Sequence, residues 1–184
     1  MIRVLMVCMG NICRSPTAEA VLRHLLKEHA PELPVEVDSA GTHGYHVGEP
    51  PDRRAIAHAA RRGVDLSALR ARRLTADDFH QFDYVLCMDE TNLGTAARLR
   101  PVQGGAHFGL LMDFAAADAP REVPDPYYGV QEDYVEVLHM IEQAADGRPD
   151  RRREGHDQAH QRHDPRALRQ REHRVGREIG RAHV

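Results

Sequence analysis

Residues 2–16 read IRVLMVCMGNICRSP and join an apolar run to a loop and a helix start. The run at 2–7 is short, rich in branched side chains and broken only by Arg3, a pattern typical of a buried β-strand. Pro16 is a residue favoured in the first turn of a helix. Apolar residues then recur at the spacing of one helical face, namely Ala18, Val21, Leu22 and Leu25. The stretch therefore predicts a strand, a short loop and an amphipathic helix.

The same alternation continues toward the C-terminus. Short apolar runs predict three more strands, at 35–37, 84–88 and 108–111. Amphipathic stretches predict helices at 53–62, 91–99 and 134–145. Because strands that alternate with helices pair in parallel through right-handed crossovers, we expect an α/β fold: an open, doubly wound, four-stranded parallel sheet flanked by helices. Ligands of such sheets bind where strands end and helices begin.

The loop between the first strand and the first helix carries groups suited to a phosphate. Cys8 ends the strand and Arg14 begins the helix, and the residues between them are Met9, Gly10, Asn11, Ile12 and Cys13. Loop amides and a helix N-terminus bind anions, and they favour the thiolate of Cys8, which is the nucleophilic form. The Arg14 fork matches two phosphoryl oxygens. Gly10 is expected to supply the backbone freedom that such a loop needs.

These residues also have simpler interpretations. Cys8 alone fits a buried strand residue and Arg14 a surface charge, but their place between a strand and a helix favours phosphate binding. Ser15 fits two roles, because its hydroxyl either caps the helix or hydrogen-bonds the Cys8 sulfur.

Composition narrows the class of protein. The chain has 184 residues, of which 41% are hydrophobic and 29% charged, as expected for one globular domain with a polar addition. No apolar run approaches the ~18 residues that cross a bilayer, and the N-terminus lacks the pattern of a secretory signal. Three cysteines are too few for a disulfide framework and favour a reducing compartment. We therefore expect a cytoplasmic protein without a membrane span.

The composition changes at residue 148. Residues 148–184, called the tail below, hold eleven Arg, six acidic residues and five of the 13 His, with no continuous apolar face. Such a segment cannot offset its ordering entropy by burial, so we expect a domain at 1–147 and a disordered or atypical tail at 148–184. A basic tail is also compatible with contacts to RNA or a membrane surface. His156, His160 and His163 have the spacing of a metal site if the tail is helical.

The motif V-C-x-G-N-x-C-R-S-P resembles that of the low molecular weight protein-tyrosine phosphatases. Further stretches match this family in its order and spacing: DSAGT at 38–42, GEPPD at 48–52, GVDL at 63–66, CMD at 87–89 and DPYYG at 125–129. The resemblance covers about residues 1–147. It implies the phosphatase I-like version of the expected fold.

The resemblance also implies a mechanism. Cys8 would attack phosphorus while Arg14 and the loop amides hold the phosphoryl oxygens, and Ser15 would hydrogen-bond the sulfur. Asp125, by itself only an Asp before Pro, would protonate the leaving group and then activate water. Because the amides and Arg14 stabilise the charge, no metal or cofactor is expected. Cys13 by itself fits a small apolar residue packed under the loop, but the resemblance favours a reversible regulatory disulfide with Cys8, which phosphate transfer itself does not need.

Substrate choice follows from the walls of the site. The resemblance places Ile12, Tyr45, Tyr127 and Tyr128 around a slot for phosphotyrosine, with tyrosine-phosphorylated proteins and a cognate tyrosine kinase as partners. Protein-arginine phosphatases of this fold carry Thr in place of Ile12 and lack the tyrosine pair. Related arsenate reductases use further downstream cysteines, whereas only Cys87 lies downstream here. A third alternative is an inactive phosphate-binding module whose tail contacts nucleic acid; nucleic-acid binding is expected of the tail alone.

One position departs from the family pattern. Asn11 and Ser39 match residues that brace the phosphate loop in the family, and Asp89 is expected to support the loop as well. A His usually joins this network where the present chain has Leu69, and Arg73 replaces a common Gln. Leucine cannot hydrogen-bond, so either one brace is missing or the local register differs, and we expect catalysis to be slower or less stable but not absent.

Overall fold

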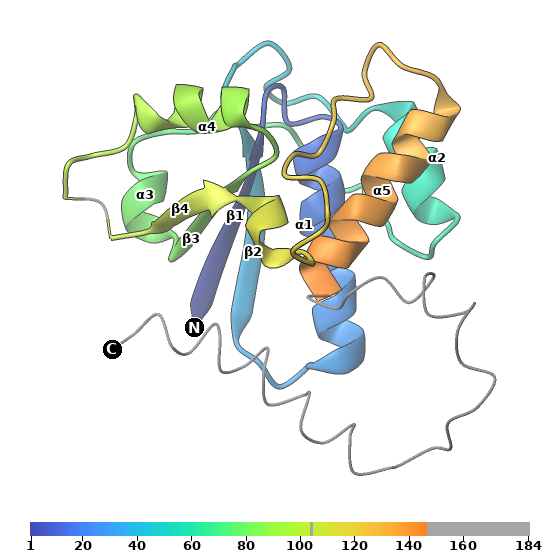
Figure 1. Cartoon of the computed structure of the whole chain (residues 1–184), viewed down its shortest axis with the longest axis horizontal. Helices are drawn as coiled ribbons and strands as arrows, with labels where there is room; N and C mark the ends of the chain where they lie inside the picture. The colour runs from blue at the N-terminus through green and yellow to red at the C-terminus, as the bar shows by residue number, and fades with distance from the viewer. Residues whose placement is uncertain (104, 147–184) are drawn as a thin grey trace. The chain divides into compact units, whose positions relative to one another are not determined.

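The structure is a computed structural model that describes residues 1–103 and 105–146 (Figure 1). Within them, four parallel strands form one sheet in the order β2-β1-β3-β4. The strands are β1 (Ile2–Cys8), β2 (Val35–Gly41), β3 (Tyr84–Cys87) and β4 (His107–Leu110). The predicted four-stranded parallel sheet is therefore confirmed.

Helices alternate with the strands along the chain. They are α1 (Arg14–His29), α2 (Arg53–Ala60), α3 (Asp78–Gln81), α4 (Glu90–Ala97), the short 3₁₀ helix η1 (Leu111–Phe114) and α5 (Gln131–Asp146). In Figure 1, α1 and α5 lie together on one side of the sheet, and α3 and α4 lie on the other. The arrangement is thus doubly wound. None of the helices in the described part of the chain is long and apolar enough to span a membrane.

The central strand positions the site. Strand β1 pairs with β2 on one edge and with β3 on the other, and its side chains from Val4 to Cys8 are buried. The chain passes from β1 to β2 in one direction and then crosses to β3 on the opposite side, so the strand order reverses beside β1. Ligands of open parallel sheets bind at such a reversal, outside the strand C-termini. The loop after Cys8 lies at this point.

The core that holds β1 in place combines the sheet with the helices of one face. Leu5 and Val7 are fully buried and pack in one cluster with Phe79 of α3 and Ala96 of α4. Burial on both faces explains why the first strand reads as a continuous apolar run rather than an alternating one.

Some boundaries differ from the sequence-based prediction. Strand β2 continues to Gly41, four residues beyond the predicted end, because Asp38–Gly41 pair in register with Leu5–Cys8. Helix α3 and the helix η1 were not predicted, since four residues are too few for a helical period to be visible. The prediction of a disordered tail, and the histidines in it, lies outside the described residues. Residues Met1–Arg148 form one compact unit.

Candidate active site

The phosphate loop, residues 8–14, links the end of β1 to the start of α1. Asn11 has a φ of 56° and is the one non-glycine residue of the described chain in the left-handed region. Gly10 does not have a positive φ, so the expectation that Gly10 supplies the special conformation is wrong. Asn tolerates the left-handed conformation because its short polar side chain makes local hydrogen bonds.

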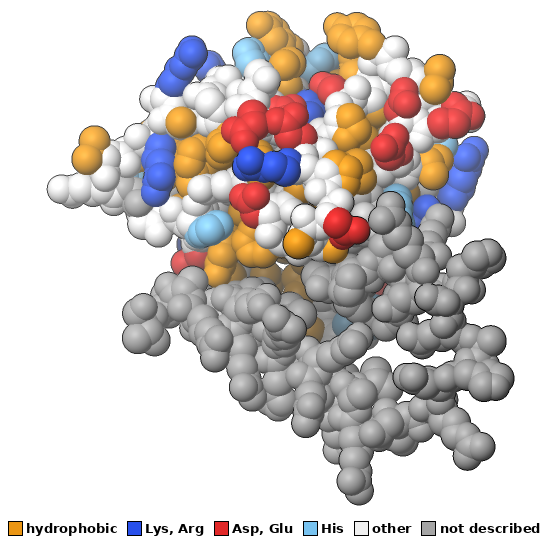
Figure 2. Space-filling model, viewed as in Figure 1, with side chains coloured by type: hydrophobic (Ala, Val, Ile, Leu, Met, Phe, Trp, Pro, Cys, Tyr) orange, Lys and Arg blue, Asp and Glu red, His pale blue; other side chains and the backbone are white. Residues whose placement is uncertain are grey.

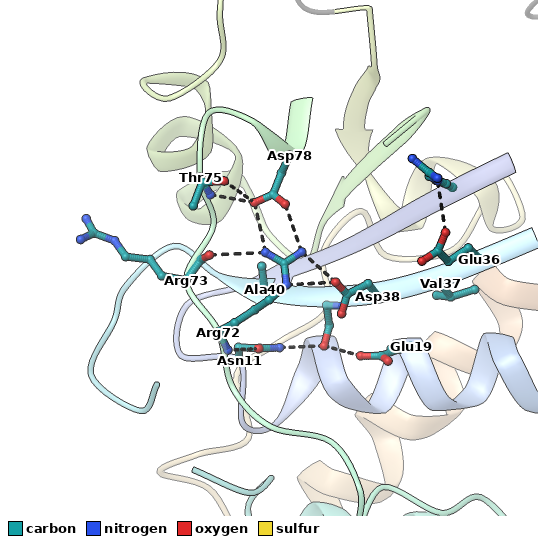
Figure 3. Close-up of polar contacts among 12 residues, drawn as sticks. Asn11, Glu19, Glu36, Val37, Asp38, Ala40, Arg72, Arg73, Thr75 and Asp78 are labelled. Atoms are coloured by element: carbon teal, nitrogen blue, oxygen red, sulfur yellow. Dashed lines mark hydrogen bonds and ion pairs between the residues drawn. The ribbon is translucent and has the colours of Figure 1, made fainter. Parts of the chain in front are cut away.

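The Asn11 side chain is the centre of a buried hydrogen-bond network. Its Nδ2 donates to Ser15 Oγ at 2.9 Å and to Ser39 Oγ at 2.8 Å, while its Oδ1 accepts from the Arg72 amide at 2.8 Å. Ser39 Oγ in turn donates to Glu19 Oε2 at 2.6 Å. Figure 3 shows this line of contacts from Asn11 to Glu19. The network therefore joins α1, β2 and the segment at Arg72 to the phosphate loop.

This network closes without Leu69. The amide of Arg72 and the carboxylate of Glu19 satisfy the outer ends of Asn11 and Ser39. Leucine at position 69 has no side-chain group that could hydrogen-bond, and the Arg72 amide occupies the Asn11 acceptor instead; the expected effect on catalysis stays a prediction. Sequence reasoning also missed Glu19, which is buried although it lies outside the predicted apolar face of the helix.

Arg72 is itself held by two carboxylates. Its guanidinium pairs with Asp38 at 2.9 Å and with Asp78 at 3.1 Å, and Figure 3 shows it pointing between them while the Arg73 side chain points away. Burial acts to lower the pKa of Arg72, but the hydrogen bonds and charges of Asp78 and Asp38 outweigh it and raise that pKa. Arg72 thereby fixes the backbone amide that Asn11 needs.

The backbone after β2 holds the loop from the other side. Thr42 N–H donates to the Cys8 carbonyl and His43 N–H to the Met9 carbonyl, each at 2.9 Å. A Cβ on Gly41 would lie 2.8 Å from the Met9 carbonyl oxygen, so only glycine permits this close approach.

Cys8 is buried at the C-terminal end of β1, and polar groups contact its sulfur. Its Sγ is 3.0 Å from Ser15 Oγ and accepts a hydrogen bond from the Asn11 amide at 3.3 Å. Ser15 is inside α1, whose N-cap residue is Cys13, so the helix-capping role considered for Ser15 is wrong. Both contacts on the sulfur stabilise a thiolate.

Arg14 forms ion pairs with two carboxylates that are distant from it in the sequence. Its side chain is 2% exposed; Nη1 donates to Asp89 at 2.5 Å and Nη2 to Asp125 at 2.9 Å. Nη1 also donates to the carbonyl of Val123. Burial acts to lower the pKa of Arg14, but the negative charges of Cys8, Asp125 and Asp89 outweigh it, and the pKa is raised. Asp89 also caps α4, so the start of that helix orients the guanidinium.

The predicted wall residues differ in exposure. Tyr45 and Tyr128 are 77% and 96% exposed, whereas Ile12 is buried in the loop. Tyr127 is also exposed, and its N–H donates to Asp125 Oδ1 at 3.1 Å. Tyr127 and Tyr128 pack edge to face, 4.9 Å between ring centres. The backbone amide of Tyr127, the first member of this pair, thus contacts the Asp125 carboxylate.

The other two cysteines are buried thiols. Burial is the largest of the effects that raise the pKa of Cys13 and of Cys87, each to about 12. Cys13 Sγ lies 3.8 Å from the hydroxyl of Tyr134 on α5. All three cysteines are free. Among residues 1–103 and 105–146, no group of three His, Cys, Asp or Glu side chains is placed to hold a metal.

A parallel α/β sheet with a Cys–Arg phosphate loop at its switch point is the architecture of a phosphatase. The family model for low molecular weight phosphotyrosine protein phosphatase matches residues 3–148, and the chain belongs to this family. The human low molecular weight phosphotyrosine protein phosphatase is 42% identical over 139 residues, 74% of this chain and 87% of its own.

Solved structures agree with this assignment. A protein tyrosine phosphatase from Entamoeba histolytica superposes with a TM-score of 0.76 at 35% identity, covering 80% of this chain and 94% of its own. A Drosophila arginine phosphatase superposes with a TM-score of 0.71 at 28% identity, covering 87% of this chain and 100% of its own.

Proposed function

We propose that this phosphatase hydrolyses phosphotyrosine in proteins through a phosphocysteine intermediate. The observation that carries the proposal is the convergence of three groups from two segments, the phosphate loop and the segment at Asp125. Cys8 Sγ is contacted by Ser15 Oγ and the Asn11 amide, and the neighbouring Arg14 guanidinium holds Asp125. A nucleophile, a cation for the phosphoryl oxygens and an acid are the groups that this reaction needs.

In the first step, the Cys8 thiolate attacks phosphorus and the bond to the phenol oxygen breaks. Arg14 and the amides of the phosphate loop hold the non-bridging oxygens, where negative charge is concentrated. Asp125 donates its proton to the departing phenolate. The products of this step are a dephosphorylated tyrosine side chain on the substrate protein and a phosphorylated Cys8.

In the second step, Asp125, now ionised, accepts a proton from water as the water oxygen attacks phosphorus. Cys8 leaves as a thiolate, which the Ser15 hydroxyl stabilises, and inorganic phosphate is released. The step returns the thiolate and the protonated Asp125 of the starting state. The buried network around Asn11 holds the loop in one conformation through both steps.

Three tyrosines near the candidate site support an aryl substrate. Tyr127 packs against Tyr128 and its backbone amide binds Asp125, and Tyr45 is largely exposed on the segment that contacts the phosphate loop. A phosphoarginine substrate is the second candidate, because one structural neighbour is a Drosophila arginine phosphatase. A screen of phosphotyrosine, phosphoarginine and arsenate separates the three chemistries, and we expect turnover of phosphotyrosine.

We further propose a cytoplasmic location and a reversible Cys8–Cys13 disulfide. All three cysteines are free, which suits a reducing compartment. The charge of Cys8 is among the influences on the pKa of Cys13, so the two sulfurs are within electrostatic range. A peroxide would take two electrons from the pair and leave a disulfide and water, and a thiol reductant would restore Cys8.

The first test is hydrolysis of p-nitrophenyl phosphate and phosphotyrosine by full-length variants. Cys8→Ser should abolish turnover, and Asp125→Ala should lower kcat/KM for phosphotyrosine by roughly 10² or more. Asp77→Ala is the matched control, because Asp77 is an exposed carboxylate at the start of α3 whose side chain makes no cap hydrogen bond. Full activity of Cys8→Ser would disprove the mechanism.

A further inference from the structure

Arg54, in the first turn of α2, contacts three separate parts of the molecule. Its guanidinium forks onto Asp52, with Nε to Oδ1 at 3.1 Å and Nη2 to Oδ2 at 3.0 Å. The same Nη2 donates to the Tyr127 carbonyl at 3.0 Å. Its carbon Cζ lies 4.8 Å from the ring centre of Tyr134 on α5. We call Asp52, Arg54, Tyr127 and Tyr134 the Arg54 junction.

On one side, the Arg54 junction is attached to the phosphate loop. Asp52 is the N-cap of α2, and its N–H donates to the Ile12 carbonyl at 2.7 Å. Although burial acts to raise the pKa of Asp52, the hydrogen bonds from Arg54 lower it, so the carboxylate is ionised at neutral pH. The two charge-assisted hydrogen bonds between the Arg54 guanidinium and the Asp52 carboxylate are of the bidentate kind that fixes the orientation of both groups.

On the other side, the Arg54 junction is attached to the segment that carries the proposed acid. Arg54 holds the Tyr127 carbonyl, and the Tyr127 N–H holds Asp125 Oδ1 at 3.1 Å. The other oxygen of Asp125 bonds Arg14. Both carboxylate oxygens of Asp125 therefore accept a hydrogen bond. One comes from Arg14, and the other comes from Tyr127, whose carbonyl is in turn bonded to Arg54.

The third attachment fixes the guanidinium itself. Arg54 lies within cation–π distance of both Tyr134 and Tyr127, at 4.8 and 5.7 Å. Tyr134 is 3% exposed and its hydroxyl contacts Cys13 Sγ in the phosphate loop. The ring that supports Arg54 is thus anchored in the protein interior.

We propose that Arg54 is a positioning residue that sets the Asp125 carboxylate for proton transfer to the leaving group. The inference rests on the proposed function and deepens it. Of the two connections that orient Asp125, the one through Arg14 also serves the phosphoryl group, whereas Arg54 reaches the phosphate loop only through Asp52 and the backbone of Ile12. Loss of Arg54 should therefore impair acid catalysis and leave nucleophilic attack intact.

Arginine suits this place and lysine does not. One guanidinium donates to both oxygens of Asp52 and to the Tyr127 carbonyl while its flat face lies near two rings. An ammonium is a point charge without a planar fork. Arg54→Lys should consequently lose the Tyr127 contact even though it keeps the charge.

The test uses the dependence of kcat/KM on the acidity of the leaving phenol. Nitrophenolate leaves with little help from an acid, whereas phenolate and tyrosinate need a proton. For Arg54→Met, we expect a loss of about twofold or less with p-nitrophenyl phosphate and of about tenfold or more with phenyl phosphate and phosphotyrosine. Arg54→Lys should show the same trend. Arg53→Met is the matched control, an exposed neighbour on α2 whose variant should behave as the wild type.

A double variant separates positioning from general damage. If Arg54 acts only through Asp125, Arg54→Met should change kcat/KM by less than about twofold in an Asp125→Ala background. A loss equal for all leaving groups, or additive with Asp125→Ala, would overturn the inference. If Arg54→Met does not fold, Asp52→Asn breaks the fork from the other side and is judged by the same two criteria. Absence of turnover in the wild type would instead reject the proposed function.

Discussion

Asn11 shapes the phosphate loop through its backbone and its side chain together. Its left-handed conformation turns its own amide toward the Cys8 sulfur, and its side chain makes three hydrogen bonds to residues of α1, β2 and the Arg72 segment. The side-chain bonds hold a conformation that most residues avoid. Geometry at the nucleophile therefore depends on a residue that takes no part in the bond changes.

The two contributions of Asn11 can be measured separately. Asn11→Gly and Asn11→Ala both lose the side-chain hydrogen bonds, but only alanine must also hold a φ of 56°. We expect Asn11→Ala to have a free energy of unfolding lower than that of Asn11→Gly by about 1 kcal/mol, and both to have reduced kcat/KM. Urea unfolding of the two variants measures the difference. Equal or greater stability of the alanine variant would show that the backbone at this residue is not held left-handed.

At the scale of elements, a buried carboxylate links α1 to β2 beneath the phosphate loop. Glu19 on α1 accepts from Ser39 on β2 and pairs with Arg23 one turn later at 2.8 Å. Burial raises the pKa of Glu19, while the Ser39 hydrogen bond and the Arg23 charge act in the other direction. The titratable carboxyl group of Glu19 thus connects α1 to β2, and Ser39 connects it further to Asn11 of the phosphate loop.

The raised pKa of Glu19 predicts a pH dependence of stability. The folded protein binds this proton more tightly than the unfolded chain, so ionised Glu19 lowers the free energy of unfolding above its folded pKa. This cost disappears as the pH falls through that raised pKa to the ordinary carboxyl value of about 4.3. The wild type should therefore gain stability relative to Glu19→Gln on acidification across this window. Urea unfolding of both at several pH values tests it, and a constant difference would exclude the titration.

At the scale of the whole molecule, residues far apart in sequence complete the site. Arg14 and Asp125 are 111 positions apart and meet only because α5 packs against α1 and α2, which brings the preceding loop over the phosphate loop. Figure 2 shows acidic and basic side chains interspersed on one face of the described part. The candidate site thus depends on the packing of α5 against α1 and α2, and not on the phosphate loop alone.

The domain boundary that the sequence predicts at 147 implies that the tail is dispensable for catalysis. The family match ends at residue 148, and the compact unit ends there too. A chain of residues 1–147 should unfold cooperatively and retain the kcat/KM of the full-length protein for phosphotyrosine. Salt-dependent RNA binding that is lost on this truncation would assign the tail a separate role. Loss of folding or turnover would show that the domain extends beyond 147.

Local features of the site followed from the sequence alone. The strand, the loop and the helix at 2–16 are neighbours in the chain, so Cys8, Ser15 and Arg14 were predictable from their order and from the chemistry of amides, thiols and guanidinium groups. The resemblance to a family then pointed to Asp125, which no local pattern distinguishes from any Asp before Pro.

Only the tertiary structure assigned the left-handed turn to Asn11 rather than Gly10, replaced the absent histidine by Glu19 and the Arg72 amide, and joined Arg54 to Asp125. Each of these depends on which side chain from a distant segment reaches a given polar atom. Sequence periodicity records which face of an element is buried, but not the partner buried against it.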